Sequence, residues 1–188
     1  GNFGRALLRL NRADLPKAQI ATAHSIYFNT AAELGLLGLL AGYFHGTWID
    51  TVVMRVTDIF LAVPPLILAL AIAAMLKPNL LNSMMAVSLM WWPWYTRLVY
   101  GLATQLRNEY FVKSAETMGA SNSHILFKEI LPNCVSPIFT KMSLDMGWVI
   151  LIGSSLSFVG LGVQPPNSSW GLLAAEGASA ITALNTAW

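Results

Sequence analysis

Residues 59–76 contain no charged side chain. A run of this length can cross the hydrocarbon core of a bilayer, because a transmembrane helix needs about 20 mostly apolar residues. The whole chain has 188 residues, of which 55% are hydrophobic and 11% charged, and its mean hydropathy is +0.57. A soluble domain typically carries about 25% charged residues. These features predict an all-α, polytopic helical membrane protein, since helices satisfy their own backbone polar groups in lipid.

The apolar pattern predicts a single transmembrane domain over 1–188 with four spans, near 20–44, 56–76, 80–105 and 136–163. A polar loop at 107–132 separates the last two spans, and we expect 164–188 to be extracytoplasmic. The first span is open to two readings, because residues 11–33 carry several charged side chains. The span either begins near Ile20 with Glu33 inside the bundle, or follows an interfacial helix. The distribution of Lys and Arg does not decide the orientation.

The polar loop has its own helical signals. Residues 109–118 form a plausible short helix, and Gly119 is placed to end it in a left-handed conformation. Ser121 or Asn122 can cap a second helix, which we expect to end at Pro132. The loop therefore predicts two short helices that meet at Gly119.

An apolar face lies on the first loop helix, outside the predicted membrane. Phe111, Val112, Ala115 and Met118 recur at helical spacing and share that face. An exposed apolar face of this kind ordinarily binds a partner, for which a protein groove is the natural candidate.

Two predicted spans contain features that allow a structural or a functional interpretation. Pro64 and Pro65 interrupt the 56–76 segment, as a packing bend or as a hinge that lines a pathway. Trp91 belongs to an aromatic cluster around Pro93, which indicates core packing or a broken helix beside a cavity.

Ionisable side chains within the predicted spans are candidates for polar contacts, because charge is costly in lipid. Lys141 and Asp145 are four residues apart and share a helical face, and Lys141 is near enough to the span end to reach the headgroups. Asp145 is then the better candidate for a polar contact or for lining a cavity. Asp58 directly precedes the uncharged run and is a second candidate.

The sequence lacks the motifs of several enzyme classes. It contains no Gly-x-x-x-x-Gly-Lys-Ser/Thr phosphate loop and no Gly-x-Ser-x-Gly turn. The three histidines have no metal-ligand spacing, and the single cysteine, Cys134, excludes an intrachain disulfide. We expect no catalytic activity, cofactor, metal or nucleic-acid partner for this chain.

Two blocks carry a resemblance to a known family. Lys113-Ser114-Ala115, followed by Gly119 and Ile130-Leu131-Pro132, resembles the EAA loop of ABC-importer permeases, with Lys113 in the place of glutamate and Ser114 in that of the first alanine. LSFVGLGVQPPNSSWGLLAAEG, over 156–177, is similar to a signature of the dipeptide/oligopeptide/nickel branch. Smaller matches at 38–42, 54–58 and 62–64 extend the resemblance over nearly all of 35–177.

The resemblance implies the ABC type I importer permease fold with a cytoplasmic coupling helix. It implies a permease subunit, multi-pass in the inner membrane, that works with a paralogous permease, two ATPase subunits that bind ATP and Mg, and an extracytoplasmic binding protein. The first and last spans of the family are expected to lie outside 1–188. The implied ATPase-docking residues are Phe111, Lys113, Ser114, Ala115, Met118, Gly119 and Ala120. Candidates for the translocation pathway are Asp58, Pro64, Pro65, Trp91 and Asp145.

Two other functional classes remain open from the residues. In an ion-coupled secondary transporter, Glu33, Asp58 and Asp145 would be proton or cation sites. The chain could also be a non-transporting membrane scaffold subunit. The substrate of an importer is open as well, with di- or oligopeptides as the leading expectation.

Overall fold

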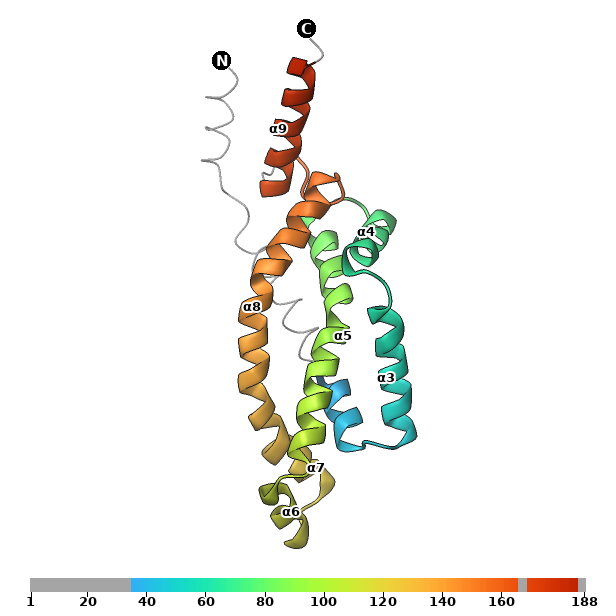
Figure 1. Ribbon diagram of the computed structural model, residues 1–188, viewed down its shortest axis with the longest axis vertical. Coiled ribbons are helices and arrows are strands. Elements are labelled where there is room, and N and C mark those ends of the chain that lie inside the picture. Colours follow the sequence, from blue (N-terminus) through green and yellow to red (C-terminus); the bar gives the residue numbers. More distant parts are fainter. Residues whose placement is uncertain (1–34, 166–168, 186–188) are drawn as a thin grey trace. The chain divides into compact units, whose positions relative to one another are not determined.

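A computed structural model describes residues 35–165 and 169–185, and every regular element in these ranges is a helix (Figure 1). The prediction of an all-α protein is confirmed. A helix over 35–43 is followed by α3 (Trp48–Leu61), α4 (Pro65–Met75), α5 (Leu80–Leu106), α6 (Tyr110–Thr117), α7 (Asn122–His124), the π-helix η1 (Ile125–Ile130), α8 (Leu131–Phe158) and α9 (Trp170–Asn185).

The described residues divide into two compact units. One unit contains Ser88–Trp148 and the described part of Asn29–Pro65, and it is called the loop-bearing unit below because it holds α6, α7 and η1. The other contains Leu66–Val87 and the described part of Val149–Trp188. Long helices α5 and α8 contribute to both units.

The helix bounds differ in detail from the predicted spans. The 56–76 segment is two helices, because α3 ends at Leu61 and α4 begins at Pro65. This break follows from the proline pair, since Pro65 at a first helical position needs no N–H partner. The 80–105 segment is one helix, and Pro93 lies inside α5 without ending it. α8 is displaced from the predicted 136–163, and the part of 20–44 before residue 35 lies outside the described residues.

By length and composition, one continuous helix among the described residues is long and apolar enough to cross a membrane. The continuous helical stretch Asn122–Phe158 has 37 residues and is apolar enough to cross a bilayer, and α3 with α4 meets the same criterion as one broken span. α5 has 27 residues, about 40 Å at 1.5 Å per residue, but its Trp, Tyr and Arg side chains make it less apolar. A multi-pass topology remains a prediction.

The helix over 35–43 packs directly on the backbone of α5. A Cβ atom on Gly38 would collide with the Thr96 carbonyl oxygen, and one on Gly42 would lie 2.7 Å from the Tyr100 carbonyl oxygen. Glycines four residues apart share a helix face, and in membrane proteins such small residues let two helix backbones approach closely. The pair therefore fixes where this helix lies against α5.

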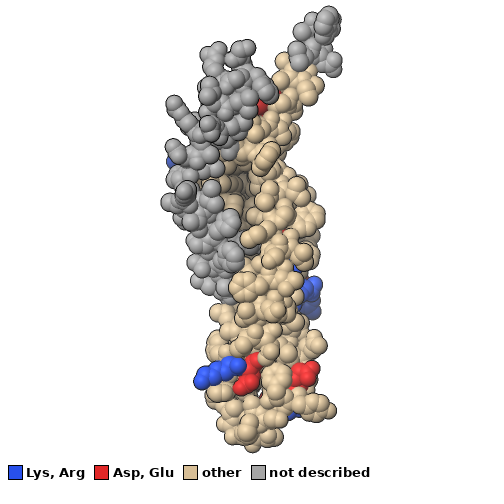
Figure 2. All heavy atoms as spheres, turned by 90° about the vertical axis from the view of Figure 1, so that its left-hand side faces the viewer, with Lys and Arg blue, Asp and Glu red and all other residues tan. Residues whose placement is uncertain are grey.

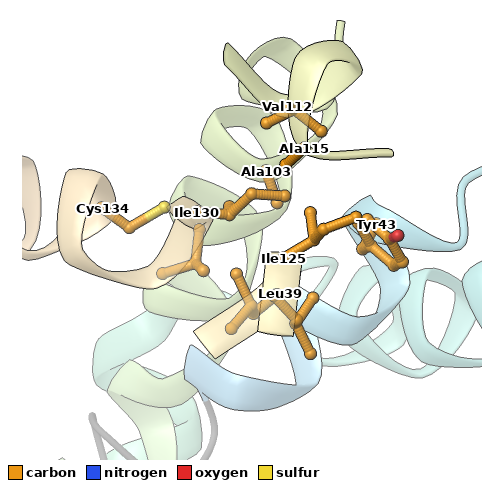
Figure 3. Packing of buried hydrophobic residues seen from close by; sticks show 10 residues of the cluster. Leu39, Tyr43, Ala103, Val112, Ala115, Ile125, Ile130 and Cys134 are labelled. Carbon is orange, nitrogen blue, oxygen red and sulfur yellow. The ribbon is translucent and has the colours of Figure 1, made fainter. Parts of the chain in front are cut away.

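An apolar cluster forms the core of the loop-bearing unit (Figure 3). Its side chains come from the helix over 35–43, α5, α6, η1 and α8, and they point toward one another between these elements. The ten members are Leu39, Tyr43, Val99, Ala103, Val112, Ala115, Ile125, Leu126, Ile130 and Cys134. The two loop helices are thus part of the same core as the longer helices.

A buried carboxylate links α5 to α8 within the loop-bearing unit. Asp145 accepts hydrogen bonds from Trp91 Nε1 and Tyr95 Oη, each at 2.9 Å, and from Lys141 Nζ at 2.6 Å. The Lys141 side chain therefore forms an ion pair with Asp145, one helical turn away. Three donors compensate the loss of water around the carboxylate, which would otherwise be costly in a low-dielectric interior.

In the other unit, α9 approaches the end of α8 closely. A Cβ atom on Gly171, near the start of α9, would collide with the Ser154 carbonyl oxygen and would lie 2.9 Å from the Phe158 amide nitrogen. The close approach therefore explains why Gly171, in the 156–177 block, is a glycine, because a larger residue would separate these two helices.

We expect Gly38→Ala to lower the free energy of unfolding by about 1–3 kcal/mol, because the added methyl group meets backbone that cannot move cheaply. Gly35→Ala, on the same helix, is the matched control, since its Cβ would meet only Val99 Cγ2 at an ordinary 3.6 Å. Detergent-solubilised protein can be unfolded with increasing SDS to compare the two variants. Equal stability would contradict the close packing.

We also expect Asp145→Asn to cost about 3 kcal/mol of unfolding free energy, since it leaves the Lys141 ammonium without its counter-charge. The double variant Lys141→Met/Asp145→Asn should recover much of that loss, because the amide oxygen can still accept from Trp91 and Tyr95. The same SDS titration measures both. A double variant less stable than the single one would show that the ion pair does not explain the cost.

Candidate functional site

Helix α6 lies, with α7, beyond the ends of α5 and α8 in the loop-bearing unit (Figure 1). It begins after Glu109, whose backbone is extended, and it ends at Met118. Gly119 then has φ +83°, its N–H donates to the Glu116 carbonyl, and the Ala120 N–H donates to the Ala115 carbonyl, each at 3.0 Å. This pair of bonds is a Schellman motif, so the predicted role of Gly119 in ending the helix is confirmed.

The second loop helix begins where predicted but does not end where predicted. Ser121 is its N-cap and accepts a hydrogen bond from the His124 N–H at 3.3 Å. The expected end at Pro132 is wrong, because α7 continues through η1 into α8. Within η1 the backbone has π-helical bonding, and the Leu131 N–H donates to the Leu126 carbonyl. The wider turn carries the helix into Pro132, which has no N–H to donate.

The two faces of α6 have different environments. Val112 is fully buried and Ala115 is 7% exposed, and both belong to the apolar cluster. Phe111, Lys113 and Ser114 are exposed, and Met118 is 81% exposed. The predicted apolar face is therefore divided between the core of this chain and its surface.

The exposed side of α6 defines a candidate docking surface. It consists of Tyr110, Phe111, Lys113, Ser114, Met118 and Gly119. Ala120 is half-buried against the cluster, and Ala115 supports the surface from below. Figure 2 shows acidic and basic side chains near this end of the loop-bearing unit.

Sequence reasoning missed two exposed aromatic residues of the loop, Tyr110 and Phe127. Tyr110 adjoins Phe111 at the start of α6, and Phe127 lies on η1. The signal was present, because an aromatic residue in an otherwise polar loop is worth testing as a contact residue. Phe127 projects from η1 while its neighbours Ile125, Leu126 and Ile130 point into the cluster.

The candidate pathway residues fall into separate places. Trp91 and Asp145 are hydrogen-bonded to each other in the interior of the loop-bearing unit. Pro64 and Pro65 are exposed at the break between α3 and α4. Asp58 forms an ion pair with Arg97 on α5, with 2.7 Å between Oδ1 and the guanidinium nitrogen. Sequence reasoning did not select Arg97, although a charge inside a long apolar helix is a recognised functional signal.

The described residues offer no group of three or more His, Cys, Asp or Glu side chains that could hold a metal ion. The loop exposes aromatic rings, a thioether and an open turn, and the apolar cluster beneath them holds them in place. Such a surface can bind a complementary groove on another protein.

A sequence profile for the family described as "Binding-protein-dependent transport system inner membrane component" matches residues 35–187. The chain is 42% identical to a probable D,D-dipeptide transport system permease protein of Escherichia coli (strain K12), over 76% of this chain and 47% of that protein. It is 38% identical to a dipeptide transport system permease protein of Alkalihalophilus pseudofirmus, over 88% and 52%. It is 41% identical to a glutathione transport system permease protein of Escherichia coli O6:K15:H31, over 85% and 53%.

The chain spans about half the length of the curated relatives that it matches. The matched region nevertheless includes every described helix, among them the loop helices and α9. The family has the ABC type I permease fold, with which the all-helical structure agrees. The chain belongs to the family of binding-protein-dependent transport system inner membrane components.

Proposed function

We propose that this chain is part of a multi-pass permease subunit of an ATP-driven importer, with di- or oligopeptides as substrates. The observation that carries the proposal is the docking surface, which exposes aromatic and Met side chains beyond the ends of α5 and α8. The names of the relatives, which are permease proteins for dipeptides and glutathione, support the substrate class. ATP and Mg would bind to two separate ATPase subunits.

The partners follow from the same proposal. A paralogous permease would complete the pathway, and an extracytoplasmic binding protein would deliver the substrate. Each of the two ATPase subunits would have a groove, and the docking surface of this chain would bind in the groove of one subunit. Phe111, Lys113, Ser114, Met118 and Gly119 are exposed for this contact, whereas Ala115 would act from beneath by holding α6 in place.

Movement at the docking surface would reach the longer helices by two routes. The first is covalent, because α7, η1 and α8 form one continuous helical stretch. The second is through side-chain packing, because Val112 and Ala115 contact the cluster that also contains Leu39 and Ala103. Closure of the ATPases would then shift these helices together and change which side of the membrane has access to the pathway.

A polar contact joins the helix over 35–43 to α7, so this helix would move with the loop helices. The Tyr43 hydroxyl donates to Asn122 Oδ1 at 3.0 Å, so the end of the helix over 35–43 is bonded to the start of α7. The Arg107 guanidinium lies 5.7 Å from the centre of the Tyr43 ring, which is within cation–π range. These contacts favour movement of the loop-bearing unit as one rigid body.

The family favours this function over an ion-coupled secondary transporter, in which Asp58 and Asp145 would be ion sites. Asp145 already accepts three hydrogen bonds from side chains, which leaves it poorly available to a cation. An experiment distinguishes an importer from a non-transporting scaffold. Only a transporting complex hydrolyses ATP faster when substrate-loaded binding protein is added.

Met118→Glu should abolish co-purification of the ATPase, because it puts a charge in the place of an 81% exposed apolar side chain of the docking surface. The control is Met75→Glu at the end of α4, where the native side chain is 87% exposed. The complex is purified in mild detergent, and the ATPase is quantified per permease. Retention of the ATPase by Met118→Glu would overturn the docking role.

Gly119→Trp should leave the permease in the membrane but uncouple uptake from ATP hydrolysis. Its matched control is Gly46→Trp, because both glycines have φ near +84° and open space around the Cβ position. Backbone strain is therefore the same in both variants, about 1–2 kcal/mol, and only the location differs. Uptake of labelled dipeptide per ATP hydrolysed is measured in proteoliposomes, and equal coupling in the two variants would contradict the role of Gly119.

A further inference from the structure

The ion pair between Asp58 and Arg97 is open to its surroundings. It joins α3 to α5 within the loop-bearing unit, yet the Arg97 side chain is 54% exposed and that of Asp58 41%. Within the described residues the Arg97 side chain makes one hydrogen bond, to Asp58 Oδ1. A guanidinium has five N–H donors, so most of them remain available to another acceptor.

Counts along the two helices place this pair about half the thickness of a hydrocarbon core away from the ends of α3 and α5. Asp58 is ten residues beyond the start of α3 at Trp48, about 15 Å at the helical rise. Arg97 is nine residues before the end of α5 at Leu106, about 14 Å. Both distances start from the end of the bundle that carries the docking surface, and the hydrocarbon core is about 30 Å thick.

The surface of α5 around Arg97 is unlike a surface that faces lipid. Trp94, Arg97, Gly101 and Gln105 are all exposed and recur at spacings of three and four residues, so they form one stripe. A Cβ atom on Gly101 would meet nothing within 4 Å, so the stripe is open beside the guanidinium. The stripe combines an aromatic ring, a cation, an open position and an amide.

Helix α3 separates polar from apolar side chains in the same region. One side carries a polar stripe that includes Asp58, and the adjacent side carries an apolar stripe. The polar stripe is Thr51, Arg55 and Asp58, and the apolar stripe is Val52, Val56 and Ile59. The apolar stripe suits lipid or a packed interface, whereas charges at this depth need protein or water around them.

We propose that Arg97 and Asp58 form a binding site for the two termini of a peptide in transit. The Arg97 guanidinium would take the C-terminal carboxylate, for which its planar fork is suited, and Asp58 would take the N-terminal ammonium. The proposal rests on the proposed function and extends it to the pathway wall. The polar stripes of α3 and α5 are that wall, and the ion pair opens when the peptide exchanges with it.

Accessibility of position 97 to water is the first test. Arg97→Cys is placed in the assembled importer in proteoliposomes and labelled with a charged, membrane-impermeant thiosulfonate. Ile59→Cys, on the neighbouring apolar stripe, is the matched control, and native Cys134 is fully buried. We expect labelling at position 97 to be about tenfold faster, since thiolates form in water and not in lipid. Gly101→Cys, one turn along the same stripe and with Arg97 intact, should in addition be labelled more slowly in a saturating dipeptide.

Equal labelling of positions 59 and 97 would overturn the proposal, and so would labelling of Gly101→Cys that dipeptide does not slow. This readout needs no transport activity. Failure of the proposed function would instead appear as a wild-type complex that has no ATP-dependent uptake.

Peptide chemistry is the second test. Arg97→Gln should lower uptake of a free dipeptide about tenfold, as expected from the loss of a charge-assisted hydrogen bond. For the C-terminally amidated peptide, the ratio of uptake by the variant to uptake by the wild type should be closer to one. Any preference of the binding protein for one peptide affects both uptake rates equally and so cancels in this ratio. Arg97→Lys should recover part of the loss. An equal loss for the free and the amidated peptide would overturn the proposal, because it would show that Arg97 does not bind the peptide carboxylate.

Discussion

The apolar cluster beneath α6 is the interaction on which the rest of the loop-bearing unit depends. A helix of eight residues is not stable alone in water, because helix nucleation is unfavourable and few hydrogen bonds repay it. Burial of Val112 and Ala115 against Ile125 and Ile130 supplies what the local sequence lacks. The outward side of α6 can then remain apolar and exposed, because its inward side holds the helix in place.

The long helices hold their charged side chains in two opposite environments. Asp145 is buried and satisfied by Trp91, Tyr95 and Lys141, so it behaves as an internal tie between α5 and α8. Asp58 and Arg97 satisfy each other at the surface and remain open. The same residue type is thus buried and bonded to three donors at one place and half exposed in a single ion pair at another.

Much of this arrangement could be predicted from local signals, and the exceptions have identifiable causes. Gly119, Ser121 and the proline pair at 64–65 act on their own backbone, so the ends of α6 and α3 followed from the sequence. The continuation through Pro132 did not, because a π-helical turn depends on packing of Ile125 and Ile130 against residues far away in the chain. The burial of Ala115 and the partner of Arg97 were missed for the same reason, since helical periodicity says which residues share a face but not what that face contacts.

The composition of the cluster also sets the order in which the subunit can be assembled. Its members extend along the chain from Leu39 to Cys134, so the seat for α6 is incomplete until residue 134 has been synthesised and its helix has packed. Contacts between residues this far apart form late, because the intervening chain must first be brought together. The surface of α6 is therefore formed only when these helices are already in place, so any protein that bound it would bind folded copies of the chain and not nascent ones.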